Sequence, residues 1–80
     1  MKLQDYLKLS LVQQELVMWC LGVTVSFRSD SFYVYQLFQV ESFYVELIYR
    51  KISRSIETIF PFEDTKYLDP YLEDMVIRIE

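Results

Sequence analysis

The sequence contains no histidine, and it has only one cysteine and one glycine. Without histidine, the chain lacks the most common general base and the most common zinc or copper ligand of proteins. One cysteine cannot form an internal disulfide or a thiolate cluster, and one glycine cannot build a phosphate-binding loop, which needs several. We therefore expect no enzymatic activity, no cofactor and no metal site.

Long apolar runs and clustered basic residues are also missing. The charge-free stretches 16–27 and 31–40 are shorter than the ~20 residues that a membrane-spanning helix needs. Lys8 interrupts the apolar run that a signal peptide would require near the N-terminus. The 8 basic residues are scattered among 12 acidic ones, whereas binding to nucleic-acid phosphates requires clustered Lys and Arg. We expect a cytoplasmic protein that binds neither a membrane nor nucleic acid.

Aromatic and β-branched side chains are abundant instead. Hydrophobic residues make up 52% of the chain and aromatic residues 18%, a bias that favours sheet and argues against disorder. The length of 80 residues predicts a single domain spanning 1–80. A chain this short buries only about 60–65% of the surface of its unfolded form. It must therefore cover its apolar residues efficiently or share them with a partner.

The N-terminal part shows helical spacing in two short stretches. Leu3, Tyr6 and Leu7 share one face of a first helix. Ser10 then precedes an apolar run and has Gln13 three residues further on, which is the pattern of a capping box. The sequence therefore predicts two helices with a break at 8–10.

The second helix is expected to bury one apolar face and to end at the only glycine. Val12, Leu16, Trp19 and Cys20 follow one another at helical spacing, so we expect them to face the core. In that position Cys20 would behave as a small buried hydrophobe. Gly22 is expected to end the helix as a residue with positive φ.

The middle of the chain predicts an antiparallel meander of four strands. Alternation of side chains or continuous apolar character predicts strands at 23–28, 32–39, 43–50 and 56–60. Short polar clusters at 29–31, 41–42 and 51–55 predict the turns between them. Pro61 is expected to end the last strand because proline removes a hydrogen-bond donor.

A further short helix is expected near the C-terminus. Asp69 followed by Pro70 has the pattern of an N-cap and a first helical residue, and Met75 belongs to the apolar stripe that follows. For residues 76–80 the pattern leaves a strand, a helix extension and a tail open. The predicted fold class is α+β, with two short N-terminal helices, a four-stranded antiparallel β-meander and a short C-terminal helix.

Three segments carry a family resemblance. They are Tyr35-Gln36-Leu37, Phe43-Tyr44-Val45-Glu46 with Tyr49, and Leu68-Asp69-Pro70-Tyr71-Leu72. Together they resemble a group of short bacterial proteins of uncharacterised function with a LYxL…FYVEVYY hairpin and a C-terminal LxPYLxxI segment. The chain departs from this group at Leu47-Ile48, where the group has Val-Tyr, and at 38–40 in the hairpin. The resemblance implies a bacterial origin and this fold, and it implies no activity, cofactor or catalytic residue.

The most unusual feature is the aromatic density of the two central strands. The stretch 32–39 is apolar on both faces, yet helices this short are expected to cover only one face of the sheet. An uncovered apolar face on a small domain marks an interaction surface, and such surfaces are rich in aromatic residues. The candidate interface on that face consists of Tyr33, Tyr35, Leu37, Tyr44 and Ile48. We expect it to form a homodimer.

Two alternative functions follow from the charged residues. The net charge of −4 is compatible with a small acidic regulator or inhibitor, similar to an immunity protein or an antitoxin, that binds a basic protein partner. A small enzyme would have to use Glu46 or Glu57 together with a tyrosine. Glu46 interrupts an apolar strand, so the simpler interpretation is a cross-strand ion pair with Arg28 or Arg50.

Overall fold

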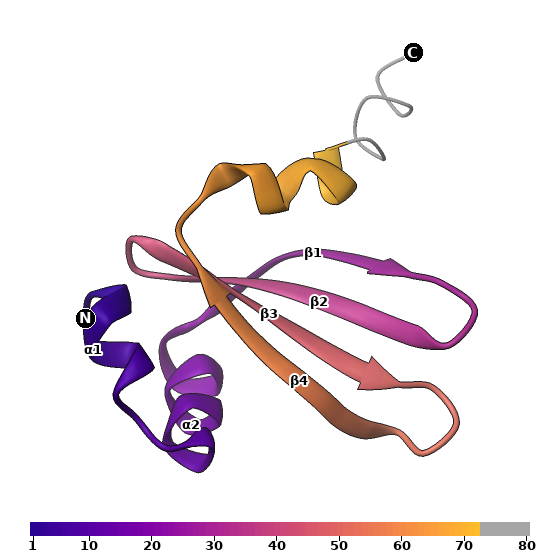
Figure 1. The fold of residues 1–80 in the computed structure, drawn as a ribbon, viewed down its shortest axis with the longest axis horizontal. Helices are drawn as coiled ribbons and strands as arrows, with labels where there is room; N and C mark the ends of the chain where they lie inside the picture. Colours follow the sequence, from indigo (N-terminus) through magenta and orange to yellow (C-terminus); the bar gives the residue numbers. More distant parts are fainter. Residues whose placement is uncertain (73–80) are drawn as a thin grey trace.

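The computed structural model describes residues 1–72 and shows two N-terminal helices, a four-stranded antiparallel sheet and a short helical segment near the C-terminus (Figure 1). The elements are α1 (Leu3–Leu7), α2 (Leu11–Leu21), β1 (Val23–Ser29), β2 (Tyr33–Val40), β3 (Phe43–Arg50), β4 (Ser55–Phe62) and the 3-10 helix η1 (Thr65–Leu68). Residues 69–72 continue η1 as a helical turn. The predicted α+β fold is confirmed, whereas Met75 and residues 76–80 lie outside the described residues.

The sheet is a simple meander in the order β1-β2-β3-β4, with each neighbouring pair antiparallel. The first hairpin is closed by Asp30, whose carboxylate accepts the backbone N–H groups of Phe32 at 2.9 Å and Tyr33 at 2.8 Å. In the next two turns Glu41 and Arg54 adopt positive φ values of 53° and 55°. All three turns lie where the polar clusters predicted them. Phe32 belongs to the first turn and not to the strand in which the sequence analysis placed it.

β1 does not keep a regular alternation of side chains. Thr24 is opposite Phe38, and Ser26 is already opposite Leu37, so Val25 is an extra residue in a β-bulge. A bulge shifts the following residues to the other face of the strand. The uninterrupted alternation predicted for this strand is therefore wrong.

β4 continues through Pro61 to Phe62, so the prediction that Pro61 ends the strand is also wrong. Pro61 is opposite Val45 on β3. Because β4 is an edge strand of the sheet formed by residues 1–72, its proline nitrogen can face away from β3, where no hydrogen bond is lost.

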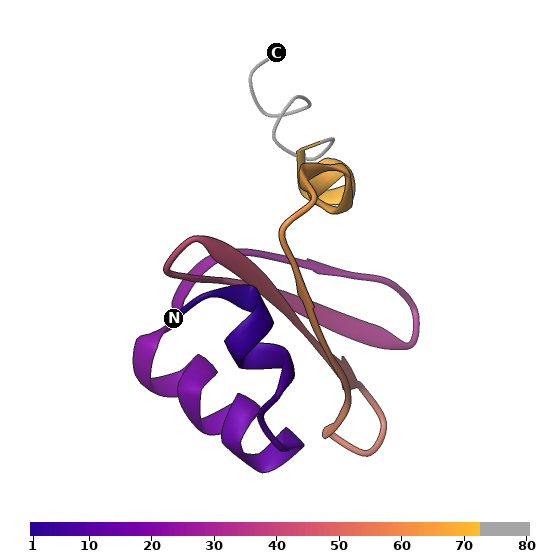
Figure 2. The same ribbon diagram turned by 60° about the vertical axis from the view of Figure 1, so that its left-hand side comes forward.

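α1 and α2 cover one face of the sheet, as Figure 2 shows from the side. The predicted capping box at the start of α2 is confirmed: the Ser10 hydroxyl accepts the Gln13 N–H at 3.2 Å, and the Gln13 side-chain oxygen accepts the Ser10 N–H at 3.0 Å. The two helices and this sheet face enclose the larger core. Its buried members are Tyr6, Met18, Phe38, Val40, Phe43, Val45 and Leu47.

α2 faces the sheet with a different side from the one predicted. Its buried residues are Gln14 and Met18. Hydrogen bonds to α1 and to the link that follows it fix this rotation. The Tyr6 hydroxyl donates to the Gln14 carbonyl at 2.6 Å, and the Gln14 side-chain amide donates to the carbonyls of Tyr6 at 3.2 Å and Leu9 at 3.4 Å. The predicted core-facing residues are exposed instead: Val12, Leu16, Trp19 and Cys20.

Gly22 is required for a reason other than the one predicted. Its φ is −78° and its ψ is 147°, which is extended backbone open to any residue. A Cβ atom at this position would lie 2.3 Å from the Met18 carbonyl oxygen and 3.1 Å from the Phe38 ring. The glycine therefore allows the end of α2 to approach β2 closely, and the prediction of positive φ is wrong.

The segment after β4 crosses the opposite face of the sheet (Figures 1 and 2). Its helical part begins at Thr65, because the Asp64 carboxylate accepts the Lys66 N–H at 3.0 Å as an N-cap. The predicted N-cap at Asp69 lies five residues after the observed N-cap at Asp64, although Asp69 is where the 3-10 helix passes into an α-helical turn. No helix among residues 1–72 is long and apolar enough to cross a membrane.

Candidate interaction surfaces

The five residues of the predicted interface lie on the sheet face opposite α1 and α2. In the β2–β3 pair, Tyr35 is opposite Ile48 and Leu37 is opposite Glu46, so these side chains share that face. Leu37, however, is only 2% exposed, and the other four predicted residues are half-buried: Tyr33, Tyr35, Tyr44 and Ile48. The expectation that this face is left uncovered is therefore wrong at its centre.

The residues after β4 provide the cover that the sequence analysis did not foresee. Tyr71, which is 2% exposed, and Phe62 form a second buried cluster with Leu37. Tyr67 packs edge-on against the rings of Phe60 at 5.1 Å and Phe62 at 5.4 Å. The segment 65–72 is thus an aromatic strap across the sheet, and a lone subunit hides part of its own aromatic face.

An ion pair between the half-buried Arg28 and the buried Glu46 helps to hold this strap to the sheet. The Tyr71 hydroxyl donates a hydrogen bond of 2.6 Å to the Glu46 carboxylate, and an Arg28 guanidinium nitrogen lies 3.4 Å from the same oxygen. Burial and then the hydrogen bond to Glu46 raise the pKa of the Tyr71 hydroxyl well above its ordinary value. The predicted cross-strand ion pair of Glu46 is confirmed with Arg28 as its partner. Tyr71 is the third member, which the sequence analysis missed.

Arg28 is further held by aromatic rings and extends the network to the first turn. Its guanidinium carbon lies 3.8 Å from the centre of the Tyr35 ring and 5.2 Å from that of Tyr71, which are cation–π contacts. The Tyr35 hydroxyl donates to the Asp30 carboxylate at 2.8 Å. This hydrogen bond raises the pKa of Tyr35, and hydrogen bonds from the Phe32 N–H, the Tyr35 hydroxyl and the Tyr33 N–H lower the pKa of Asp30.

This network is suited to structural support. The Glu46 carboxylate is already engaged by one cation and one hydroxyl, and the Tyr71 hydroxyl is held in its protonated form. Within residues 1–72 no group of three acidic or sulfur-bearing side chains lies close enough together to hold a metal ion. The cluster joins β1, β3 and the strap, which are distant in sequence, and it fixes their relative positions.

Another group of exposed apolar side chains lies on α2 and on the edge strand β1 that follows it. We define the α2–β1 surface as the five residues Leu16, Trp19, Val23, Val25 and Phe27. Each of them exposes between 45% and 67% of its surface. The Trp19 ring is edge-on to the Phe38 ring at 5.3 Å, so the C-terminal half of α2 packs against β2, the strand next to β1. Cys20 is exposed beside this surface, and the prediction that it is buried is wrong.

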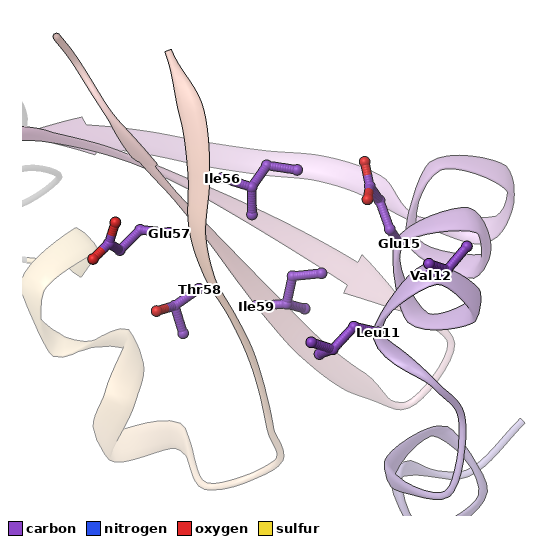
Figure 3. Close-up of a pocket in the computed structure, with 7 residues that line it drawn as sticks. All are labelled: Leu11, Val12, Glu15, Ile56, Glu57, Thr58 and Ile59. Carbon is purple, nitrogen blue, oxygen red and sulfur yellow. The ribbon is translucent and has the colours of Figure 1, made fainter. Parts of the chain in front are cut away.

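A groove of about 370 Å³ lies between the N-terminal half of α2 and β4 (Figure 3). Figure 3 shows Leu11 and Val12 of α2 on one side of the groove and Ile56 and Ile59 of β4 on the other. Glu15 adds a carboxylate on the α2 side. Burial of the Tyr49 hydroxyl, and next the negative charge of Glu15, raise the pKa of Tyr49 on β3.

Comparisons with known proteins do not extend this description. No protein-family model, no curated protein and no solved structure matches the chain. The resemblance to the group of short bacterial proteins therefore stays a prediction.

Proposed function

We propose that this protein is a small, non-catalytic protein-interaction domain of the bacterial cytoplasm that works as a homodimer, with the α2–β1 surface buried between two copies. The observation that carries the proposal is the exposure of five large apolar side chains along two elements joined directly by Gly22. Exposed apolar areas of this kind on small soluble domains mark interaction sites. The predicted dimer is retained, but its contact is assigned to a different face of the molecule.

The size of the surface is compatible with a specific dimer. Such interfaces bury roughly 800 Å² on each partner, and an enclosed aromatic side chain contributes roughly 150–250 Å². Trp19 and Phe27, each about half exposed, supply roughly a quarter of the required area. The three aliphatic members add to this area, and the remainder must come from residues next to the surface on α2 and β1.

Electrostatics also favour contact between two copies at this place. None of the five residues of the α2–β1 surface is charged. The net charge of −4 is therefore carried by other parts of the chain, where it keeps the protein soluble without opposing contact here. A two-fold axis would place the same apolar residues on both sides of the interface.

The test is the mass in solution, measured by sedimentation equilibrium at micromolar concentrations. The wild type should approach twice the 9.8 kDa of one chain, and Leu16→Glu should reduce the mass to that of one chain. Ile52→Glu is the matched control, because Ile52 is 91% exposed in the turn before β4 and lies outside the surface. A wild type that stays monomeric, or a Leu16→Glu variant that stays dimeric, overturns the proposal.

The same experiment tests the aromatic face that the sequence predicted. Tyr33 is the member of that face nearest the turn of the β1–β2 hairpin, and it is not part of the buried cluster around Tyr71. Because the strap already covers the centre of this face, we expect Tyr33→Glu to remain dimeric. If Tyr33→Glu is monomeric and Leu16→Glu is dimeric, the dimer contact lies on the aromatic face and not on the α2–β1 surface.

A second candidate function is the binding of a basic protein partner, and Glu15 supports it. Glu15 is half-buried at the apolar groove, and the ion pairs among residues 1–72 do not include it. A partner that carries a basic side chain next to an apolar one could pair the basic group with the Glu15 carboxylate and place the apolar group in the groove. Co-purification of a basic protein that is released by salt and lost in Glu15→Gln would support this function. A partner retained equally by Glu15→Gln would count against it.

A further inference from the structure

The two outer strands of the sheet differ in how well their free edges are protected. Within residues 1–72, β1 and β4 each have one neighbouring strand, so backbone groups along their outer edges have no partner strand in this part of the chain. In β4, Pro61 lacks an N–H group, and Glu57 is an extra residue in a bulge between the pairs formed by Ile56 and Thr58. Both α1 and α2 also contact this strand. Proline, charge, bulges and covering helices all oppose pairing with another strand.

The edge of β1 lacks most of these features. The bulge at Val25 lies before the stretch 26–29, which contains no proline. The single charge in this stretch, Arg28, is engaged by Glu46 and by the Tyr35 ring on the sheet face. Phe27 is 59% exposed. A strand edge without a partner among residues 1–72 and with an exposed aromatic side chain is a template for another strand.

We infer that β1 pairs in antiparallel fashion with β1 of a second copy, across a two-fold axis at Phe27, so that the two sheets become one continuous sheet. This inference rests on the proposed homodimer and specifies how its two chains meet. With the axis at Phe27, the two Phe27 rings lie opposite each other, and Arg28 lies opposite Ser26 of the second copy. No charged residue then faces a like charge across the new strand pair, and aromatic pairs of this kind stabilise antiparallel strands.

The position of α2 favours a second copy over an unrelated strand. An axis perpendicular to the sheet keeps the helices of both copies on the same face. Trp19 of α2 packs against Phe38 of β2, which is opposite Thr24 of β1. Phe27 is opposite Gln36, which lies two residues before Phe38, so Phe27 faces the same side of the sheet as α2. One symmetric strand pair thus covers the unprotected edge and brings the exposed apolar residues of both copies to one face of the joined sheet.

The experiment is amide hydrogen exchange of the wild type at a low and a high protein concentration, together with mass measurements. Paired strands protect their amides, so exchange within 26–29 should slow as the dimer forms. The variant Phe27→Lys places like charges opposite each other at the axis and should raise the dimer dissociation constant by on the order of tenfold or more. Phe32→Lys is the matched control, because Phe32 is equally exposed in the adjoining turn but lies outside β1.

Three results separate the inference from the function on which it rests. Concentration-dependent protection of 26–29, with a monomeric Phe27→Lys and a dimeric Phe32→Lys, supports the inference. A wild-type dimer in which exchange within 26–29 is the same at both concentrations overturns the inference and leaves the proposed homodimer in place. A wild type that is monomeric at both concentrations overturns both. The exchange measurement needs no variant, so a Phe27→Lys protein that fails to fold does not affect the decision.

Discussion

Removal of the Tyr71 hydroxyl is the sharpest test of how the strap is held to the sheet. In Tyr71→Phe the ring remains in the cluster with Leu37 and Phe62, but the 2.6 Å hydrogen bond to the buried Glu46 carboxylate is lost. Arg28 at 3.4 Å is then the remaining partner of that oxygen. A hydrogen bond to a charged group contributes about 1.5–3 kcal/mol, so we expect the free energy of unfolding to fall by about 2 kcal/mol.

The corresponding change in melting temperature is large for a chain of this length. An unfolding entropy of about 2.1 cal/mol/K per residue gives about 170 cal/mol/K for 80 residues. A loss of about 2 kcal/mol therefore lowers the midpoint of thermal unfolding, measured by circular dichroism, by about 12 °C. A Tyr71→Phe midpoint within about 2 °C of the wild type would refute this account of the strap.

Two further variants show whether the effect comes from this hydrogen bond. Tyr67→Phe is the matched control, because Tyr67 lies on the same strap and its hydroxyl makes no hydrogen bond within residues 1–72. Its unfolding free energy should stay within about 0.5 kcal/mol of the wild type. In a Glu46→Gln background, the charge of the acceptor is gone, so adding Tyr71→Phe should cost less than half as much as in the wild type. An equal cost in both backgrounds would show that the charge of Glu46 does not contribute to this hydrogen bond.

Other predictions concern pH, the end of α2 and its cap. Unfolded tyrosines ionise near pH 10, whereas burial raises the pKa of Tyr6 to about 12 and that of Tyr71 further, so the folded state retains protons that the unfolded state loses. The free energy of unfolding should therefore be unaffected by these two groups below about pH 10 and should fall above it by up to about 2.7 kcal/mol per pH unit. Urea titrations at several pH values should find a smaller slope in the double variant Tyr6→Phe, Tyr71→Phe. Gly22→Ala should cost roughly 1–3 kcal/mol in chemical unfolding, because its Cβ would overlap the Met18 carbonyl oxygen; an unchanged midpoint would contradict the close approach. Ser10→Ala should cost about 1 kcal/mol by loss of the capping box, and no loss of helix stability would contradict that assignment.

Features that depend on nearby residues could be predicted from the sequence. The capping box at Ser10, the turn at Asp30 and the order of the four strands depend on residues a few positions apart. The ion pair of Glu46 with Arg28 also follows from the meander, because a charge inside an apolar strand needs a partner on a neighbouring or nearby strand.

The rotation of α2 could not be predicted, because two of its faces carry apolar residues. Spacing alone favours the face with Leu16 and Trp19. The structure buries Gln14 and Met18, because the side chain and carbonyl of Gln14 form hydrogen bonds with α1. Gln14 is buried because of its hydrogen bonds with Tyr6 of another helix, and such a contact leaves no trace in the apolar periodicity of α2.

The coverage of the second sheet face depended on a long-range contact as well. The sequence analysis counted helices and left the aromatic face open, whereas the strap folds back so that Tyr71 reaches Glu46, 25 residues earlier in the chain. The only local hints were the N-cap at Asp64 and a tyrosine beside Pro70. The direction of the chain after β4 decided which apolar surface stayed exposed, and it moved the expected contact from the aromatic face to α2 and β1.

The fluorescence of Trp19 offers the most direct measurement of whether the α2–β1 surface is shared between two copies. It is the only tryptophan in the chain, it belongs to this surface, and it is 49% exposed in one subunit. If a second copy covers it, raising the protein concentration through the micromolar range should shift its emission to shorter wavelength, and Leu16→Glu should abolish the shift. Emission that stays at the wavelength of a half-exposed indole at every concentration would contradict the account.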